Sequence, residues 1–164
     1  LRPDKGVPEL IEAIRQLRRQ WRNIVLVLVG PMESTHMNIP KHDGWIRVEG
    51  PTEDPLSFYW SFDIFCLPSH REGFPIAPLE AQSCAVPSVL SDATGCIDAI
   101  APDNSAITTA VGDSQSLSAA LEPLVCDAEL RLRAGAKARA WVQDNFDDRE
   151  VRAAVHHFLN TRVS

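Results

Sequence analysis

Two glutamates, Glu72 and Glu80, are separated by seven residues in the stretch 65–85. The stretch begins with apolar residues typical of a buried strand, continues with a polar loop that carries Glu72, and ends with a helix that carries Glu80 in its first turn. A helix N-terminus attracts anions, and carboxylates accept hydrogen bonds from sugar hydroxyls. A sugar diphosphate combines both kinds of group, so we expect this stretch to bind one.

Each glutamate taken alone has a simpler explanation. Glu80 would then complement the dipole of its helix, and Glu72 would be a solvated loop residue. The flanking sequences Leu-Pro-Ser, Glu-Gly-Phe-Pro and Leu-Glu-Ala favour the ligand-binding interpretation for the pair.

Lys5 is the third residue whose position suggests chemistry. With Gly6 it precedes a run in which apolar residues recur at helical spacing. A lysine at a helix N-terminus opposes the helix dipole but is well placed to bind phosphate. We therefore expect Lys5 to contact the diphosphate, and the arginines of the following helix to be mainly solvated.

The elements that must position these residues alternate along the chain. Apolar and β-branched runs predict strands at residues 24–29, 46–48, 64–67, 88–90 and 106–109. Helices are predicted at residues 7–21, 55–61, 78–85, 96–100, 115–125, 128–145 and 147–159. This order predicts an α/β fold, a Rossmann-like open parallel sheet with helices on both faces, in which 24–29 is a central strand and 64–67 a buried one.

Ligands of such sheets bind at the carboxyl ends of the strands. The rim is therefore expected to carry Gly30, Glu49, residues 70–74 and Thr94. Two local predictions concern helix ends and packing. Ser114 should cap the helix that follows it, and the aromatic residues 58–60 should pack beneath the sheet.

Composition limits the alternatives. The 164 residues suffice for one domain, and a net charge of −6 disfavours a nucleic-acid partner. No apolar run approaches the length of a membrane span. The four cysteines show no metal-binding spacing with one another or with the five histidines. We expect reduced, mostly buried thiols and no metal site.

The sequence PSHREGFPIAPLEA, residues 68–81, resembles the E-x(7)-E signature of retaining glycosyltransferases with the GT-B fold, in the group 1, or family four, set. The stretches LRPDKGVPELIEAIRQL and VPSVLSDATGCIDAI resemble the same family. The resemblance implies the C-terminal half of a GT-B fold. It also implies transfer of a sugar from a nucleotide diphosphate sugar to an acceptor, in surface polysaccharide or glycoconjugate synthesis.

The resemblance also implies roles for individual residues. Glu72 would be catalytic by holding and orienting the donor sugar, Glu80 would bind the ribose, and Lys5 would bind the diphosphate. Other donor-binding residues implied are Gly30, Glu49, Gly50, His70, Arg71, Gly73, Phe74, Pro75, Ile76, Thr94 and Gly95. The chain departs from the family at Pro75, where glycine is common, and before residue 106, where a glycine-rich stretch is usual.

In this family a strand ending in Gly-Arg precedes the residue that matches Leu1. We therefore expect residues 1–164 to be a donor-binding domain truncated at its start, inactive alone, with the acceptor domain absent from this chain. Expected partners are the nucleotide sugar and a sugar or lipid-linked acceptor, with no metal or other cofactor. The expected location is cytoplasmic, where the protein could also attach peripherally to the inner face of the membrane.

Two alternative functions stay open at this point. One is a nucleotide-sugar binding module without catalysis. The other is an epimerase or phosphorylase of the same fold. Phosphorylases of this fold need a lysine that holds pyridoxal phosphate, and no lysine among Lys5, Lys41 and Lys137 stands out as that residue.

Overall fold

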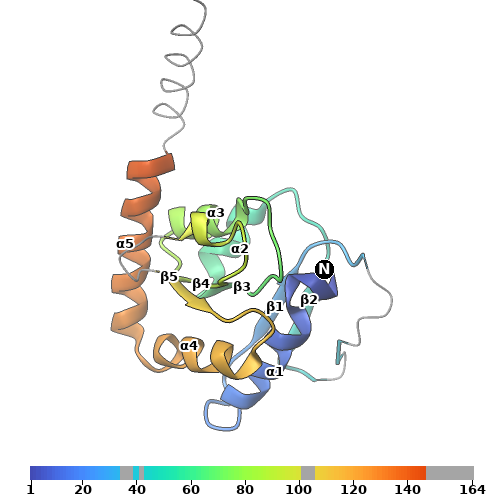
Figure 1. Cartoon of the computed structure of the whole chain (residues 1–164). Coiled ribbons are helices and arrows are strands. Elements are labelled where there is room, and N and C mark those ends of the chain that lie inside the picture. Colours follow the sequence, from blue (N-terminus) through green and yellow to red (C-terminus); the bar gives the residue numbers. More distant parts are fainter. Residues whose placement is uncertain (34–38, 41–42, 101–105, 147–164) are drawn as a thin grey trace, which may run out of the picture.

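The computed structural model describes residues 1–33, 39–40, 43–100 and 106–146. Its strands are β1 (Leu26–Val29), β2 (Ile46–Glu49), β3 (Phe65–Leu67), β4 (Ser88–Ser91) and β5 (Ala106–Thr109) (Figure 1). Its helices are α1 (Val7–Leu17), α2 (Pro55–Ser61), α3 (Ala77–Ser83), α4 (Ser114–Cys126) and α5 (Ala128–Phe146), with short 3-10 turns η1 (Pro3–Lys5) and η2 (Ile97–Ala99). The predicted order of elements is confirmed, and the helix predicted at 147–159 lies outside the described residues.

Parallel strand pairing confirms the predicted α/β class. β1 pairs with β2, and β3, β4 and β5 pair in that order, all in parallel. Helices α2 and α3 lie on one side of the strands and α1 and α4 on the other (Figure 1). Within the described residues the strands form two sheets rather than one. The predictions of a central strand at 24–29 and a buried strand at 64–67 are therefore wrong for the described residues, because β1 and β3 are edge strands there and β3 is only half-buried.

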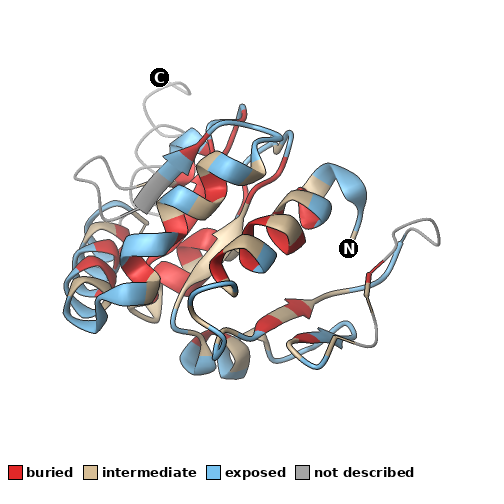
Figure 2. Ribbon diagram, turned by 90° about the horizontal axis from the view of Figure 1, so that it is seen from below, coloured by how far each residue is buried: buried red, intermediate tan, exposed pale blue. Residues whose placement is uncertain are grey.

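The main core lies between α1, α4 and the strands. The buried face of α1 confirms the helical spacing of its apolar residues, and buried leucines of α4 pack in the same cluster. Figure 2 shows these buried faces turned toward the interior. Trp21 lies beyond the end of α1 but still packs, half-buried, against this core. Arg18 is not simply solvated, because its guanidinium lies 5.3 Å from the ring centre of Trp45 and donates to the Ile24 carbonyl.

Two helix ends differ from prediction. α3 ends at Ser83 rather than Ala85, because Ala85 adopts a left-handed φ of 61°. Asp113, not Ser114, caps α4, since its carboxylate accepts hydrogen bonds from the Gln115 and Ser116 amides at 2.9 and 3.0 Å. An aspartate can reach these two amides from outside the helix, as N-caps do.

Candidate functional site

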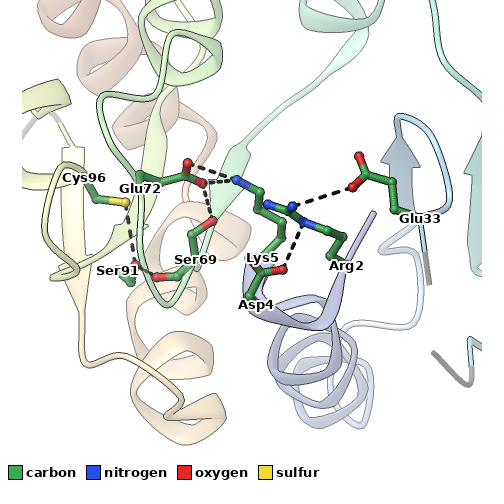
Figure 3. A network of polar contacts seen from close by, with 8 residues as sticks. All are labelled: Arg2, Asp4, Lys5, Glu33, Ser69, Glu72, Ser91 and Cys96. Carbon is green, nitrogen blue, oxygen red and sulfur yellow. Dashed lines mark hydrogen bonds and ion pairs between the residues drawn. The ribbon is translucent and has the colours of Figure 1, made fainter. Parts of the chain in front are cut away.

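Glu72 and Lys5 come from distant parts of the sequence and meet at the carboxyl end of β3. The Lys5 ammonium donates to both carboxylate oxygens of Glu72, at 2.8 and 2.9 Å, and the Ser69 hydroxyl donates to Oε1 at 2.6 Å (Figure 3). The Glu72 side chain is 12% exposed and that of Lys5 31%. This geometry fixes the carboxylate in a charge-assisted network, and both side chains lie in the wall of a cavity.

The loop that carries Glu72 is tied down on both sides. On one side the His70 amide donates to the Asp4 carbonyl at 2.8 Å. On the other side the Glu72 amide donates to the Thr94 carbonyl at 3.1 Å, and the buried Ser91 hydroxyl donates to the Ser69 carbonyl (Figure 3). The position of Glu72 is therefore set by backbone contacts with η1 and with the segment after β4.

Two glycines allow these segments to approach so closely. Gly6 has φ 69°, and a Cβ there would lie 2.0 Å from the Pro68 carbonyl oxygen. Gly95 has φ 84°, and a Cβ there would lie 2.4 Å from the Glu72 carbonyl oxygen and 2.3 Å from that of Gly73. No side chain fits at either position, so both glycines help to place the Glu72 loop.

Glu80, in the first turn of α3, has a partner that the sequence did not reveal. The Tyr59 hydroxyl donates to Glu80 Oε2 at 3.0 Å. Tyr59 is buried, and this burial, with the hydrogen bond and charge of Glu80, raises the pKa of the Tyr59 hydroxyl well above its usual range. Tyr59 therefore stays a donor at neutral pH and holds one carboxylate oxygen of Glu80.

A cavity of about 1120 Å³ opens beside these residues. Of the predicted site residues, its lining contains Lys5, Gly30, Glu72, Pro75 and Ile76. Tyr59 and Ala77 also line it, so the start of α3 faces the same space.

The other predicted residues lie around the cavity rather than in its wall. Glu49 and Gly50 are exposed at the end of β2, where the Gly50 carbonyl accepts from the Gly30 amide at 3.2 Å. His70 is exposed and lies 3.0 Å from Glu9 through Nε2, and Phe74 packs on Phe146 with ring centres 5.9 Å apart. Arg71, Gly73 and Thr94 are exposed, Glu80 is half-buried and Gly95 is buried, and none of these five lines the cavity.

Sequence reasoning missed several contributors. Ser69 lies in the predicted polar loop, yet it is fully buried and its hydroxyl donates to Glu72. Arg2 lies at the same rim, paired with Asp4 at 3.2 Å and Glu33 at 3.6 Å (Figure 3). Trp60 was predicted to pack beneath the sheet, and this is wrong because its side chain is 74% exposed. The phase of the α2 helix turns Tyr59 inward and Trp60 outward, which a run of three aromatic residues does not reveal.

The described residues contain no group of three or more histidine, cysteine, aspartate or glutamate side chains arranged to hold a metal ion. All four cysteines are free, with Cys96 buried, Cys66 and Cys84 half-buried and Cys126 exposed. None of the helices in the described part of the chain combines the length and apolarity needed to cross a bilayer.

Over residues 1–141 the chain matches the sequence model of a family described as glycosyl transferases group 1. The chain belongs to this family. Among curated members it is 29% identical to the capsular polysaccharide biosynthesis glycosyltransferase CapM of Staphylococcus aureus, over 96% of this chain and 43% of CapM. It is 31% identical to an N-acetylgalactosaminyltransferase of Campylobacter jejuni that acts on N,N'-diacetylbacillosaminyl-diphospho-undecaprenol, over 78% of this chain and 34% of that protein. This group 1 chain thus spans less than half the length of these relatives.

Solved structures show the same fold. Anabaena HepE, in a complex with UDP, superposes with a TM-score of 0.87 at 22% identity, over 98% of this chain and 46% of HepE. The C-terminal domain of the group 1 protein LpcC from Francisella tularensis superposes with a TM-score of 0.67 at 19% identity, over 90% of this chain and 83% of that domain. The fold is therefore that of a GT-B glycosyltransferase domain.

Proposed function

We propose that this chain is the donor-binding domain of a retaining glycosyltransferase that uses a nucleoside diphosphate sugar. The proposal rests on the Lys5–Glu72 pair in the cavity wall, with Glu80 in the first turn of the adjoining helix α3. These three residues provide one cation for the diphosphate and two carboxylates for hydroxyl groups.

The pairing explains how a carboxylate can lie beside a diphosphate. An isolated Glu72 would repel phosphate, but the Lys5 ammonium neutralises its charge locally. An ammonium has three N–H donors, and contacts to the two Glu72 oxygens leave one for a phosphate oxygen. Lys5 would thereby stabilise the negative charge that develops on the leaving diphosphate, while Glu72 accepts from hydroxyls of the donor sugar.

Glu80 would bind the ribose of the nucleotide. Tyr59 fixes Oε2, so Oε1 is the oxygen that a ribose hydroxyl can approach. The N-terminus of α3 adds backbone N–H groups, but α3 has only seven residues, so Lys5 is the stronger anion-binding feature. No metal is needed for these steps in the proposal.

The relatives support a more specific proposal for the donor and the acceptor. HepE binds UDP and UDP-glucose, and CapM belongs to capsular polysaccharide biosynthesis. We propose a UDP-sugar donor of hexosyl or N-acetylhexosaminyl type and an acceptor in surface polysaccharide or glycoconjugate synthesis. In this proposal the acceptor binds mainly to a preceding domain, the sugar keeps its anomeric configuration, and the protein works in the cytoplasm.

The test is turnover of UDP-glucose by a longer polypeptide that joins a preceding acceptor domain to this chain. We expect release of UDP in the presence of EDTA, and a loss of about 100-fold or more in turnover for Glu72→Gln with UDP affinity changed only a few-fold. Nuclear magnetic resonance of the sugar product separates the alternatives. An epimerised UDP-sugar would indicate an epimerase, and UDP binding without any turnover would indicate a binding module; either result would overturn the proposal.

A further inference from the structure

Helix α5 lies alongside α3, the helix that carries Glu80 (Figure 1). Inside α5, Gly135 lies against Ala85, just past the end of α3. At the end of α5, Phe146 packs on Phe74, just before the start of α3. Gly135 and Phe146 are as far apart in the sequence as Ala85 and Phe74. The two segments therefore run antiparallel, and α5 contacts the segment that contains α3 at both of its ends.

The contact at Ala85 is a backbone contact. A Cβ at Gly135 would lie 1.9 Å from the Ala85 carbonyl oxygen, so only glycine allows this approach. Glycine inside a helix is usually destabilising, and the close packing against Ala85 accounts for it here. Ala138 and Val142 continue the buried face of α5, and Val142 belongs to the core cluster that contains Leu79 of α3. These contacts fix α5 against α3 before the helix reaches the loop that precedes α3.

Phe146 makes the contact at the other end. Its ring centre lies 5.9 Å from that of Phe74, at an interplanar angle of 40°, and 5.2 Å from that of Trp141, at 69°. Tilted and edge-on arrangements of this kind are favourable between aromatic rings. Phe146 and Trp141 also pack, partly buried, against the core cluster that contains Leu79. The core and Trp141 thus hold the Phe146 ring in place for its contact with Phe74.

The loop that precedes α3 has few backbone attachments near Phe74. The Glu72 amide donates to the Thr94 carbonyl at 3.1 Å. The next two residues, Gly73 and Phe74, make no backbone hydrogen bond within the part of the chain that the structure describes. Glycine gives the backbone there additional freedom. Phe74 is 47% exposed, and its ring contact with Phe146 anchors a part of the loop that backbone hydrogen bonds do not.

We propose that Phe146 is a positioning residue, which acts through Phe74 to hold residues 72–76 in the conformation that receives the donor sugar. The assignment of the sugar rests on the proposed function, in which Glu72 accepts hydrogen bonds from sugar hydroxyls. The contact between the two rings can be tested without any ligand.

The proposal separates the sugar from the nucleotide. In the proposed function Lys5 and Glu80 bind the diphosphate and the ribose, whereas residues 72–76 surround the sugar. Loss of the Phe146 ring should therefore weaken binding of a UDP-sugar more than binding of UDP. A residue needed only for stability would lower both apparent affinities by the same factor, through the fraction of folded protein.

The first test is amide hydrogen exchange of the full chain, measured for Phe146→Ala, Phe146→Tyr and Phe74→Ala. The Glu72 amide reports opening of the loop, and the amides of α1 report unfolding of the whole domain. We expect the Glu72 amide to exchange about three- to tenfold faster in either alanine variant, relative to the α1 amides. Phe146→Tyr keeps the ring and should behave as wild type does. The double alanine variant should show no further increase, because both substitutions remove the same contact.

Two control variants separate this effect from general destabilisation. Leu132→Ala changes α5 on its outer face, where Leu132 is 68% exposed. Asp113→Ala removes the α4 cap and destabilises the domain away from the loop. Neither should change exchange at Glu72 relative to the α1 amides. Phe74 is exposed, so Phe74→Ala provides the measurement even if Phe146→Ala does not fold.

The second test is calorimetric titration of the full chain with UDP and UDP-glucose. We expect Phe146→Ala to lower the affinity for UDP-glucose about three- to tenfold and the affinity for UDP less than about twofold. Phe146→Tyr should keep both affinities.

Exchange at Glu72 that stays unchanged in both alanine variants, or that rises only in step with the α1 amides, would overturn the proposal. Equal losses of affinity for UDP and UDP-glucose would overturn the role of Phe146 toward the sugar. If wild type binds neither ligand, the proposed function fails instead, and the exchange results still decide whether Phe146 holds the loop.

Discussion

Replacing Lys5 by methionine tests the ion pair between Lys5 and Glu72, on which the proposed site depends. The change keeps much of the side-chain length but leaves the Glu72 carboxylate, which is 12% exposed, with the Ser69 hydroxyl as its remaining side-chain donor among the described residues. Exposed ion pairs contribute about 0–1 kcal/mol, whereas removing one partner of a buried pair costs about 3–5 kcal/mol. Because the lysine is 31% exposed, we expect an intermediate loss of about 2 kcal/mol in the free energy of unfolding.

Urea unfolding of four proteins measures this loss: wild type, Lys5→Met, Glu72→Gln and the double variant. The double variant should lose less than the sum of the single variants, because the neutral Glu72→Gln side chain no longer needs a cation. A loss of about 2 kcal/mol also predicts a fall in Tm of about 4–8 °C for a domain of this size. Asp113→Ala, which removes the α4 cap away from the rim, provides a control for general destabilisation.

The same variants separate a structural role from a binding role. Lys5→Met should weaken UDP binding by about tenfold or more, because one charge-assisted contact to phosphate is lost. Asp113→Ala should leave UDP affinity unchanged. If Lys5→Met neither destabilises the fold nor weakens UDP binding, the reasoning about the pair is wrong. If Lys5→Met lowers the free energy of unfolding but leaves UDP affinity unchanged, Lys5 has a structural role and does not bind the diphosphate.

Three further predictions concern the surroundings of the site. Tyr59→Phe should weaken UDP binding several-fold and cost about 1 kcal/mol of stability, since Glu80 loses its donor; unchanged affinity in calorimetry would contradict this. Gly95→Ala should cost about 2 kcal/mol in urea unfolding and displace the Glu72 loop, because its Cβ would lie 2.4 Å from a carbonyl oxygen; a stable variant with normal turnover in the longer polypeptide would show that the loop tolerates the shift. Burial raises the pKa of the Cys66 thiol to about 12, so at about pH 8 iodoacetamide should modify the exposed Cys126 first, as peptide mass mapping would show; rapid modification of Cys66 in the folded chain would contradict its burial.

Hydrophobic periodicity was sufficient to predict the fold class and most elements. The bounds of α2 and β5 agree with the prediction, and β1, β2 and β4 differ by one or two residues. These segments carry strong local patterns, such as the β-branched and leucine run that forms β1. The sequence did not predict that β1 and β3 lie at the edges of their sheets. The place of a strand in a sheet depends on which strands lie beside it, and its own residues do not define this.

The site was only partly predictable for a related reason. Glu72, Glu80 and Lys5 were found because their residue types and spacing suggest ligand chemistry. The contact between Tyr59 and Glu80 depends on how α2 packs against α3, which periodicity does not define. The close approach of Gly95 to the Glu72 loop likewise depends on tertiary structure, which local sequence patterns do not define.

The central claim is that the rim binds a nucleoside diphosphate through Glu80 and Lys5. Calorimetric titration of the chain with UDP, GDP and ADP, for wild type and Glu80→Ala, tests it most directly. We predict weak binding of one nucleotide by wild type, and an affinity lower by about tenfold or more in Glu80→Ala, because a charge-assisted hydrogen bond of about 1.5–3 kcal/mol is lost. Equal affinities in the two proteins would contradict the proposal that Glu80 binds the ribose. The chain would then share the fold of its relatives but not the proposed binding site.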